Sequence, residues 1–187
     1  EKAQLERLIQ TPRRTLNTAI VGKAAARIAE LAGFSVPAGT RALVAEAGGV
    51  GPAYPMSMEK LSPTLGFFVV NDWKEGCQKC IEILNFGGRG HTLSLHTKDD
   101  EVARQFALKK PAFRICINTP AALGAVGYTT NLFPSMTLGC GAPGGNITSD
   151  NISPLHLINL KRAAYGVRDV PAPQRAAVAG SAKGATI

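Results

Sequence analysis

The stretch that runs from LGFFVV (Leu65–Val70) to FRICIN (Phe113–Asn118) decides the fold of this chain. LGFFVV is a continuous apolar run, as expected for a β-strand that is covered on both faces. After it come a helical pattern over Trp73–Phe86, the alternating strand HTLSLH (His91–His96), a second helical pattern over Asp99–Lys110, and FRICIN. This β-α-β-α-β order, with connections long enough for crossovers, predicts an α/β fold of mostly parallel strands flanked by helices.

The segments upstream of this stretch are predicted to be ordered as well. Apolar side chains recur at helical spacing over Lys2–Gln10 and over Gly22–Gly33, and Gly33 is placed to cap the second helix. A short strand is expected at Arg41–Glu46. Asp72 is expected to cap the helix that follows LGFFVV, because its carboxylate can accept hydrogen bonds from free backbone N–H groups.

Residues 119–152 change character, because they are rich in Gly, Thr, Asn and Pro. A loop of this length is uncommon in a compact domain and is often functional. Ser153–Ala164 is predicted to be a final helix, with Ser153 as N-cap and Pro154 at its first position. We expect one domain over residues 1–168 and a flexible or arm-like tail over residues 169–187.

Composition excludes several classes of protein. Hydrophobic residues make up 45% of the 187 residues and charged residues 18%, which is ordinary for a soluble globular protein. No apolar run approaches the roughly 18 residues of a membrane span, so no membrane association is expected. The net charge of +8 suits nucleic acid or an anionic cofactor such as coenzyme A. The basic residues are scattered rather than clustered, which disfavours nucleic acid and leaves a merely solubilising role open.

The four cysteines predict no metal site. Cys77 and Cys80 form a CxxC, but neither a second CxxC nor a histidine pair at zinc spacing accompanies it. Both fall inside a predicted helix, where residues three apart share a face, so two small packed side chains are expected. Cys116 lies in an apolar strand, where a thiol is inert, and Cys140 in the glycine-rich segment is the one candidate for reactivity.

Four segments resemble, in order, motifs of the aldehyde dehydrogenases that form acyl-coenzyme A. MEKLSPTL (Met58–Leu65) resembles the Glu-x-Φ-Gly-Pro segment, in the Glu-Lys-Leu-Ser-Pro form of the acylating branch. NFGGRGHT (Asn85–Thr92) is similar to that branch's Gly-Gly-x-Gly-His-Thr, and RICINTP (Arg114–Pro120) to its strand ending in Asn-Thr-Pro. TLGCG (Thr137–Gly141) is similar to its glycine-rich loop, and the resemblance covers residues 10–168.

The resemblance implies the C-terminal portion of an aldehyde dehydrogenase catalytic domain and assigns roles to three residues. Glu59 stands where a carboxylate binds the two ribose hydroxyls next to the nicotinamide, which suits its two acceptor oxygens. Leu61 stands where an apolar side chain contacts the nicotinamide ring. His91 matches the active-site histidine, a candidate to assist proton transfer or to orient the thioester. The glycine-rich loop would form part of the pocket wall.

The implied reaction is the oxidation of an aldehyde to an acyl-CoA, with NAD or NADP as cofactor and coenzyme A as co-substrate. In the family, the cofactor domain and the nucleophilic cysteine lie upstream of these motifs. This sequence has no GxGxxG that opens a helix after a strand, and it starts at Glu1 without Met. We therefore expect a fragment that lacks the nucleophile and is inactive alone. Cys140 is a cysteine in the family pattern too, where it is not the nucleophile.

Alternatives stay open within and outside the family. The aldehyde could be acetaldehyde, propionaldehyde or sulfoacetaldehyde. The cationic Arg89 would suit sulfoacetaldehyde, because this substrate is anionic. A bifunctional alcohol–aldehyde dehydrogenase is less favoured, because no iron-dependent domain follows Ile187. The resemblance implies a homo-oligomer of the full-length protein, in the cytoplasm or inside a bacterial microcompartment. A different class is a non-enzymatic basic module that binds an anionic partner.

Overall fold

The structure is a computed structural model that describes residues 1–169. The chain divides into two units, residues 1–157 and residues 158–187. The tail expected over residues 169–187 lies outside the described residues, except for Asp169. None of the helices within residues 1–169 combines the length and the apolarity that crossing a bilayer requires.

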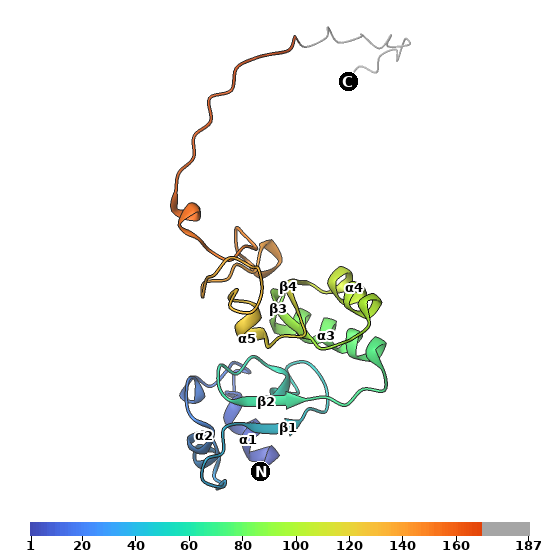
Figure 1. Cartoon of the computed structure of the whole chain (residues 1–187). Coiled ribbons are helices and arrows are strands. Elements are labelled where there is room, and N and C mark those ends of the chain that lie inside the picture. Colours follow the sequence, from blue (N-terminus) through green and yellow to red (C-terminus); the bar gives the residue numbers. More distant parts are fainter. Residues whose placement is uncertain (170–187) are drawn as a thin grey trace, which may run out of the picture. The chain divides into compact units, whose positions relative to one another are not determined.

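The first unit begins with two helices that pack on a small sheet (Figure 1). The helices α1 (Lys2–Ile9) and α2 (Ala25–Ala32) and the strand β1 (Leu43–Glu46) share one hydrophobic cluster. Gly33 ends α2 in the left-handed conformation, with φ of 87°, so the predicted cap is confirmed. The largest fully buried side chains among the described residues lie in this region, and they are Ile9, Ile20, Ile28, Met56 and Thr64.

The strand β1 pairs in parallel with β2 (Thr64–Phe67), with Val44 opposite Leu65. The prediction that LGFFVV is covered on both faces is wrong for the described residues. Side chains alternate between the two faces of a strand. The helices cover the face with Leu43 and Thr64, whereas Val44, Leu65 and Phe67 on the other face are 60%, 53% and 55% exposed. Val69, just after β2, is exposed too.

The second half of the unit has the predicted order of helices and strands. The helix α3 (Trp73–Gly87) follows Asp72, whose carboxylate accepts from the backbone N–H groups of two residues at 2.8 Å, as predicted. The strand β3 (Gly90–Leu95) comes next, and α4 (Asp100–Lys109) follows, capped in the same way by Asp99. The last strand is β4 (Ala112–Ile117).

The strands are parallel, as the order of elements predicts, and they form two sheets among the described residues. One sheet contains β1 and β2, and the other contains β3 and β4. The helices α3 and α4 share a hydrophobic cluster with β3 that contains Cys77 and Phe106. The strand direction follows from the long connections, which leave room for a crossover helix between β3 and β4.

The glycine-rich segment after β4 contains little regular structure, as predicted. It holds the short helix α5 (Ala121–Gly124), a 3₁₀ turn at Ala142–Gly144 and one isolated antiparallel bridge between Leu138 and Asn151. Two further 3₁₀ turns lie earlier in the chain, at Thr18–Ile20 and Pro55–Ser57.

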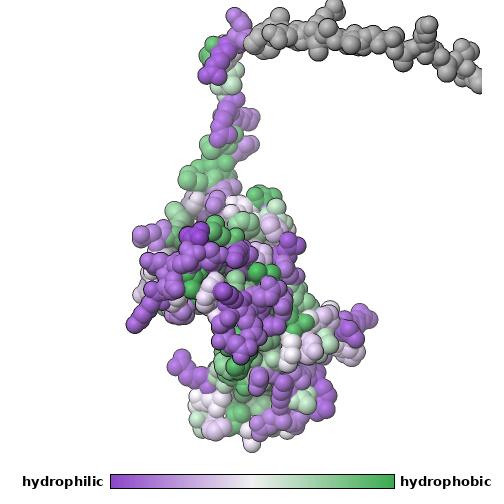
Figure 2. All heavy atoms as spheres, turned by 90° about the vertical axis from the view of Figure 1, so that its right-hand side faces the viewer, coloured by the Kyte–Doolittle hydropathy of each residue, from purple (hydrophilic) through white to green (hydrophobic). Residues whose placement is uncertain are grey.

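The helix predicted at Ser153–Ala164 is wrong. Only the 3₁₀ turn Pro154–Leu157 forms, and the residues from Ile158 to Asp169 have no regular structure. Short helices are marginal in water unless an apolar face packs on a partner. Here Leu155 and Leu157 are exposed, so that packing is absent among the described residues. Apolar and polar side chains follow one another in the open along residues 158–169 (Figure 2).

Candidate functional site

A cavity of about 450 Å³ lies where the end of α3 meets the segment that precedes β2. We call it the Glu59 cavity. One wall comes from the MEKLSPTL motif and β2, and the other from the end of α3 and the start of β3. Its lining residues include Met56, Glu59, Lys60, Ser62, Thr64, Phe68, Ile83, Gly87, Gly88 and His91.

The segment that carries Glu59 is held by the side chain of its neighbour. The Lys60 ammonium donates to the carbonyl oxygens of Met56 and Met58, at 2.7 and 2.8 Å. Burial lowers the pKa of Lys60 from its ordinary value, because the charged form loses hydration. These two bonds fix the backbone just before Glu59, so that the lysine positions the loop rather than offering a free cation.

Backbone geometry shapes the same segment. Gly66 in β2 lets the Met56 backbone approach closely, because a Cβ at Gly66 would stand 2.4 Å from the Met56 oxygen. Leu61 adopts a positive φ of 47°, which is uncommon for a leucine, and its carbonyl accepts a hydrogen bond from Gly22 N–H at 2.9 Å. The chain turns sharply at Leu61, immediately after Glu59 and Lys60.

Two of the three residues predicted for the site meet in this cavity. Glu59 and His91 both line it, and both are exposed residues. Neither side chain has a hydrogen bond or an ion pair to another described residue. Leu61 does not line the cavity, and its side chain is 56% exposed.

The wall of the cavity contains two hydroxyl groups that the sequence reasoning missed. The Ser62 Oγ and Thr64 Oγ1 atoms are buried and have no hydrogen-bond partner in the part of the chain that the structure describes, and Thr64 as a whole is only 2% exposed. An unpaired buried hydroxyl costs free energy, and atoms this deeply buried lie behind the surface of the cavity wall. The signal in the sequence is the pair of polar residues that flanks Pro63 at the start of an apolar strand.

The glycine-rich loop does not form a wall of the Glu59 cavity, contrary to expectation. It lies instead against the start of β3, where a Cβ at Gly90 would stand 1.7 Å from the Cys140 oxygen. The loop therefore packs against the backbone of Gly90, next to His91. Arg89, the candidate partner for an anionic aldehyde, is exposed and does not line the cavity.

No cysteine lines the Glu59 cavity. Cys77, Cys116 and Cys140 are buried, and Cys80 is half-buried. Burial raises the pKa of Cys116, which agrees with an inert thiol in an apolar strand. The Cys140 Sγ atom lies 3.2 Å from the Gly144 oxygen and 3.1 Å from Asn146 Oδ1, inside the loop. Within residues 1–169 no cluster of His, Cys, Asp or Glu could hold a metal ion.

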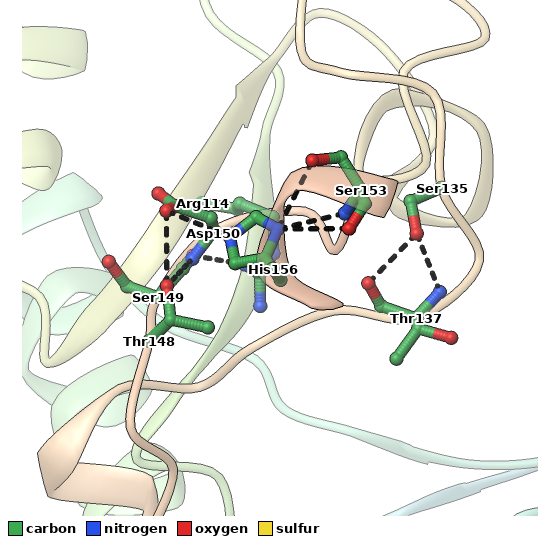
Figure 3. A network of polar contacts seen from close by, with 8 residues as sticks. All are labelled: Arg114, Ser135, Thr137, Thr148, Ser149, Asp150, Ser153 and His156. Atoms are coloured by element: carbon green, nitrogen blue, oxygen red, sulfur yellow. Dashed lines mark hydrogen bonds and ion pairs between the residues drawn. The ribbon is translucent and has the colours of Figure 1, made fainter. Parts of the chain in front are cut away.

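Arg114 ties the glycine-rich loop to the β3–β4 sheet (Figure 3). It projects from β4, is buried, and donates to the Gly139 and Ser149 carbonyl oxygens at 2.7 and 2.9 Å. Its Nε donates to Thr92 Oγ1 at 3.0 Å on the neighbouring strand. One buried guanidinium thus connects two strands with both sides of the loop.

Ser153, His156 and Asp150 lie in line near this arginine, as in a nucleophile–base–acid arrangement (Figure 3). The geometry does not support catalysis. The His156 Nδ1 accepts the backbone N–H of Ser153 at 2.9 Å, so its lone pair is not free to take the Ser153 hydroxyl proton. The Nε2 atom lies 3.4 Å from the Asp150 carboxylate, a long contact. The three residues form a local turn.

The comparisons with known proteins agree with the motifs. No family model matches the chain. The bifunctional aldehyde-alcohol dehydrogenase AdhE of Escherichia coli strain K12 is 47% identical over 80% of this chain, which spans 17% of that protein. A crystal structure of a probable aldehyde dehydrogenase from Listeria monocytogenes EGD-e is 50% identical, with a TM-score of 0.85, over 91% of this chain and 38% of that one.

A further crystal structure narrows the family. An acetylating aldehyde dehydrogenase from Geobacillus thermoglucosidasius is 45% identical, with a TM-score of 0.84, over 91% of this chain and 37% of that one.

The chain belongs to the acylating aldehyde dehydrogenases.

The similarity covers only part of each relative. The chain spans 17% to 38% of the length of the relatives named above. The relatives include a bifunctional aldehyde-alcohol dehydrogenase and an acetylating aldehyde dehydrogenase. The similarity therefore does not exclude the bifunctional enzymes. For an acylating aldehyde dehydrogenase, the Glu59 cavity is the candidate active-site region.

Proposed function

We propose that this chain contributes part of the active site of a CoA-acylating aldehyde dehydrogenase. In that reaction an aldehyde, coenzyme A and NAD or NADP give an acyl-CoA and the reduced cofactor. The observation that supports the proposal most directly is that Glu59 and His91, from two separate family motifs, line one cavity. Acetaldehyde and propionaldehyde are the substrates we would assay first.

The residues present fit the ribose of a nicotinamide cofactor. Glu59 offers a carboxylate with no partner within residues 1–169, and its two acceptor oxygens can receive two vicinal hydroxyl protons. Leu61 would have to turn toward the nicotinamide ring, since it does not line the cavity in this structure. The cofactor, when bound, would accept the hydride from the substrate.

His91 is our candidate for proton handling at the thioester. It stands at the start of β3, where its backbone N–H donates to the Gly88 oxygen at 3.1 Å. Its imidazole borders the cavity and has no partner among the described residues, so it is free to exchange a proton with a ligand.

The chain alone is expected to be inactive, because none of its four cysteines lines the cavity and the reaction needs a thiolate there. The test is an assay of the full chain with acetaldehyde or propionaldehyde, coenzyme A and NAD, in which the absorbance of NADH is measured over time. No NADH should form. Sustained turnover would contradict the absence of a nucleophile from this part of the site.

Cofactor contact is tested by binding rather than by turnover. Saturation-transfer NMR of NAD with the chain should show contacts to the ribose protons next to the nicotinamide. Glu59→Gln should weaken them, because the amide has one acceptor oxygen in place of two. Glu46→Gln is the matched control, since Glu46 is an exposed carboxylate on β1 outside the cavity. Equal signals from both variants would remove Glu59 from the proposal.

The competing class, a basic module for an anionic partner, makes a different prediction. It expects retention on heparin and none on coenzyme A–agarose, whereas the dehydrogenase proposal expects the reverse. Sulfoacetaldehyde is not favoured as substrate by Arg89, because this side chain does not line the cavity. A homo-oligomer of the full-length protein and a cytoplasmic or microcompartment location remain proposals from the family resemblance.

A further inference from the structure

Cys77 and Lys110 form a buried pair that the proposed reaction does not use. Cys77 lies on α3 and Lys110 immediately after α4, and each residue is only 6% exposed. The Lys110 Nζ atom contacts the Cys77 Sγ atom directly. The pair lies in the hydrophobic cluster between α3, α4 and β3, on elements other than those that carry Glu59.

The surroundings of Lys110 supply no carboxylate. Among the described residues, its ammonium has no ion pair, and its other close neighbour is the face of the Phe106 ring, 4.0 Å from the ring centre. A buried ammonium without a carboxylate is costly, and the Cys77 sulfur is its hydrogen-bond partner among the described residues. Proton transfer within such a pair exchanges a thiol beside a free amine for a thiolate beside an ammonium, and either form contains a nucleophile.

A small molecule can come close to Cys77. A second cavity of about 250 Å³ opens on Cys77 and is also lined by Trp73, Lys74, Gln78, Ile81 and Lys109. Hydrogen peroxide is far smaller than this space. Cys77 is thus largely buried, and yet it lines a cavity that is large enough for a small oxidant.

Cys80 is the competing partner, and the geometry disfavours it. Residues three apart on a helix have Cβ atoms about 5–6 Å apart, whereas a disulfide needs about 3.5–4.5 Å. Burial raises the pKa of the Cys80 thiol, which keeps it protonated and a poor nucleophile. The Lys110 nitrogen, by contrast, already touches the Cys77 sulfur.

We propose that Cys77 and Lys110 form a redox modification site, at which peroxide links the Cys77 sulfur to the Lys110 nitrogen in a sulfenamide. The site would respond to an oxidant independently of the aldehyde reaction, and thiols would reverse it.

The chemistry balances with peroxide as the single oxidant. The Cys77 thiolate attacks one peroxide oxygen, the O–O bond breaks, and the departing hydroxide takes a proton from the Lys110 ammonium to become water, which leaves Lys110 as a free amine. The sulfur, oxidised by two electrons, is then a sulfenic acid. The free amine of Lys110 attacks this sulfur, the S–O bond breaks, and the departing hydroxide leaves as water with the proton lost by nitrogen. One thiol, one amine and one peroxide thus give one S–N bond and two waters.

The test is peroxide treatment of the folded full chain, followed by mass spectrometry. The intact mass should fall by about 2 Da, the loss of two hydrogens, and dithiothreitol should restore it. Trypsin cuts after Lys79, which separates Cys77 from Cys80, and it does not cut between Lys110 and Pro111. The expected product is therefore residues 75–79 joined to residues 110–114. Residues 75–79 joined to residues 80–89 would mean a disulfide and would overturn the proposal.

Variants sharpen the assignment. Cys80→Ser should keep the cross-link, and Lys110→Gln should replace it by a sulfenic acid at Cys77 that dimedone traps. Lys109→Gln is the matched control, because Lys109 is exposed and lines the same cavity but has no contact with the sulfur. A cross-link that moves to Lys109, or a wild-type Cys77 that goes directly to sulfinic acid, would each refute the site. The wild-type result decides the matter even if a variant fails to fold.

Discussion

Arg114 shows how much one side chain decides in this chain. It interrupts the apolar strand FRICIN, and its guanidinium is buried between β3, β4 and the glycine-rich loop. The sequence places it in a family motif but gives no reason for a cation there. The reason is tertiary, because the loop turns back and presents two carbonyl oxygens that the arginine alone satisfies.

Replacing this arginine should destabilise the fold. In Arg114→Met, the Gly139 and Ser149 carbonyl oxygens lose their donors, and we expect a loss of about 2–4 kcal/mol in the free energy of unfolding. Urea unfolding followed by circular dichroism measures it. Arg104→Met is the control, since Arg104 is an exposed arginine paired only with Glu101 on α4, and it should change the midpoint little. Similar midpoints for both variants would contradict the bridging role.

Glu101 gives a pH prediction on the same residue scale. Hydrogen bonds from Arg104 and Gln105 lower the pKa of its carboxyl from 4.5 to about 2. Because the folded pKa lies below the unfolded one, any stabilisation by Glu101 is present above pH 4.5 and is lost as the pH falls through 2. An NMR titration of the side-chain carboxyl should show a midpoint near 2, and Arg104→Ala should move it upward. A midpoint at the ordinary value in the wild type would refute the pairing.

At the scale of elements, the local signals were sufficient to locate the helices and strands from α1 to β4. Asp72 and Asp99 cap α3 and α4 by accepting from backbone N–H groups, and these caps follow from short-range chemistry alone. The helix predicted after Ser153 failed for the opposite reason. Its propensity was adequate, but no surface among the described residues receives its leucines.

The contact between β3 and the glycine-rich loop gives a prediction at this scale. Gly90 and Gly145 have nearly the same φ, 79° and 81°, but a Cβ at Gly90 would meet the Cys140 oxygen, whereas Gly145 faces open space. Gly145→Ala should therefore cost only the backbone strain of about 1–2 kcal/mol. Gly90→Ala should cost clearly more and should shift the NMR signals of His91, because the loop must move away from the start of β3.

Urea midpoints of the two variants measure the difference. Equal losses would mean that the loop does not pack against β3 as the structure describes.

At the scale of the whole molecule, the exposed face of the β1–β2 sheet stands out. Val44, Leu65 and Phe67 lie side by side on it, more than half exposed, and contiguous apolar surface of this kind promotes association. We expect the chain to self-associate as its concentration rises, and Phe67→Lys to reduce this in sedimentation experiments. Leu108→Lys on α4 is the control, since Leu108 is a single exposed leucine outside this face. An unchanged distribution for Phe67→Lys would exclude this face.

The candidate site was predictable in part. Glu59 and His91 could be predicted as candidate site residues because each belongs to a short motif, whose members are adjacent in the sequence. Lys60, Ser62 and Thr64 lie in the same stretch, yet their roles depend on which atoms come near them after folding. The expectation for Leu61 remains a proposal, because the side chain lies outside the cavity in this structure.

The sequence by itself determined the helices and strands from α1 to β4, the parallel direction of the strands, and the family. Each of these depends on local order, namely side-chain periodicity, capping residues and motifs whose members are close in the chain. Only the tertiary structure decided which residues share a cavity, which face of β2 stays exposed, and why Arg114 and Lys110 are buried. The physical reason is that burial and hydrogen-bond satisfaction depend on neighbours that are distant in sequence. Lys110 meets Cys77 across two helices, and nothing in the order of residues announces that contact.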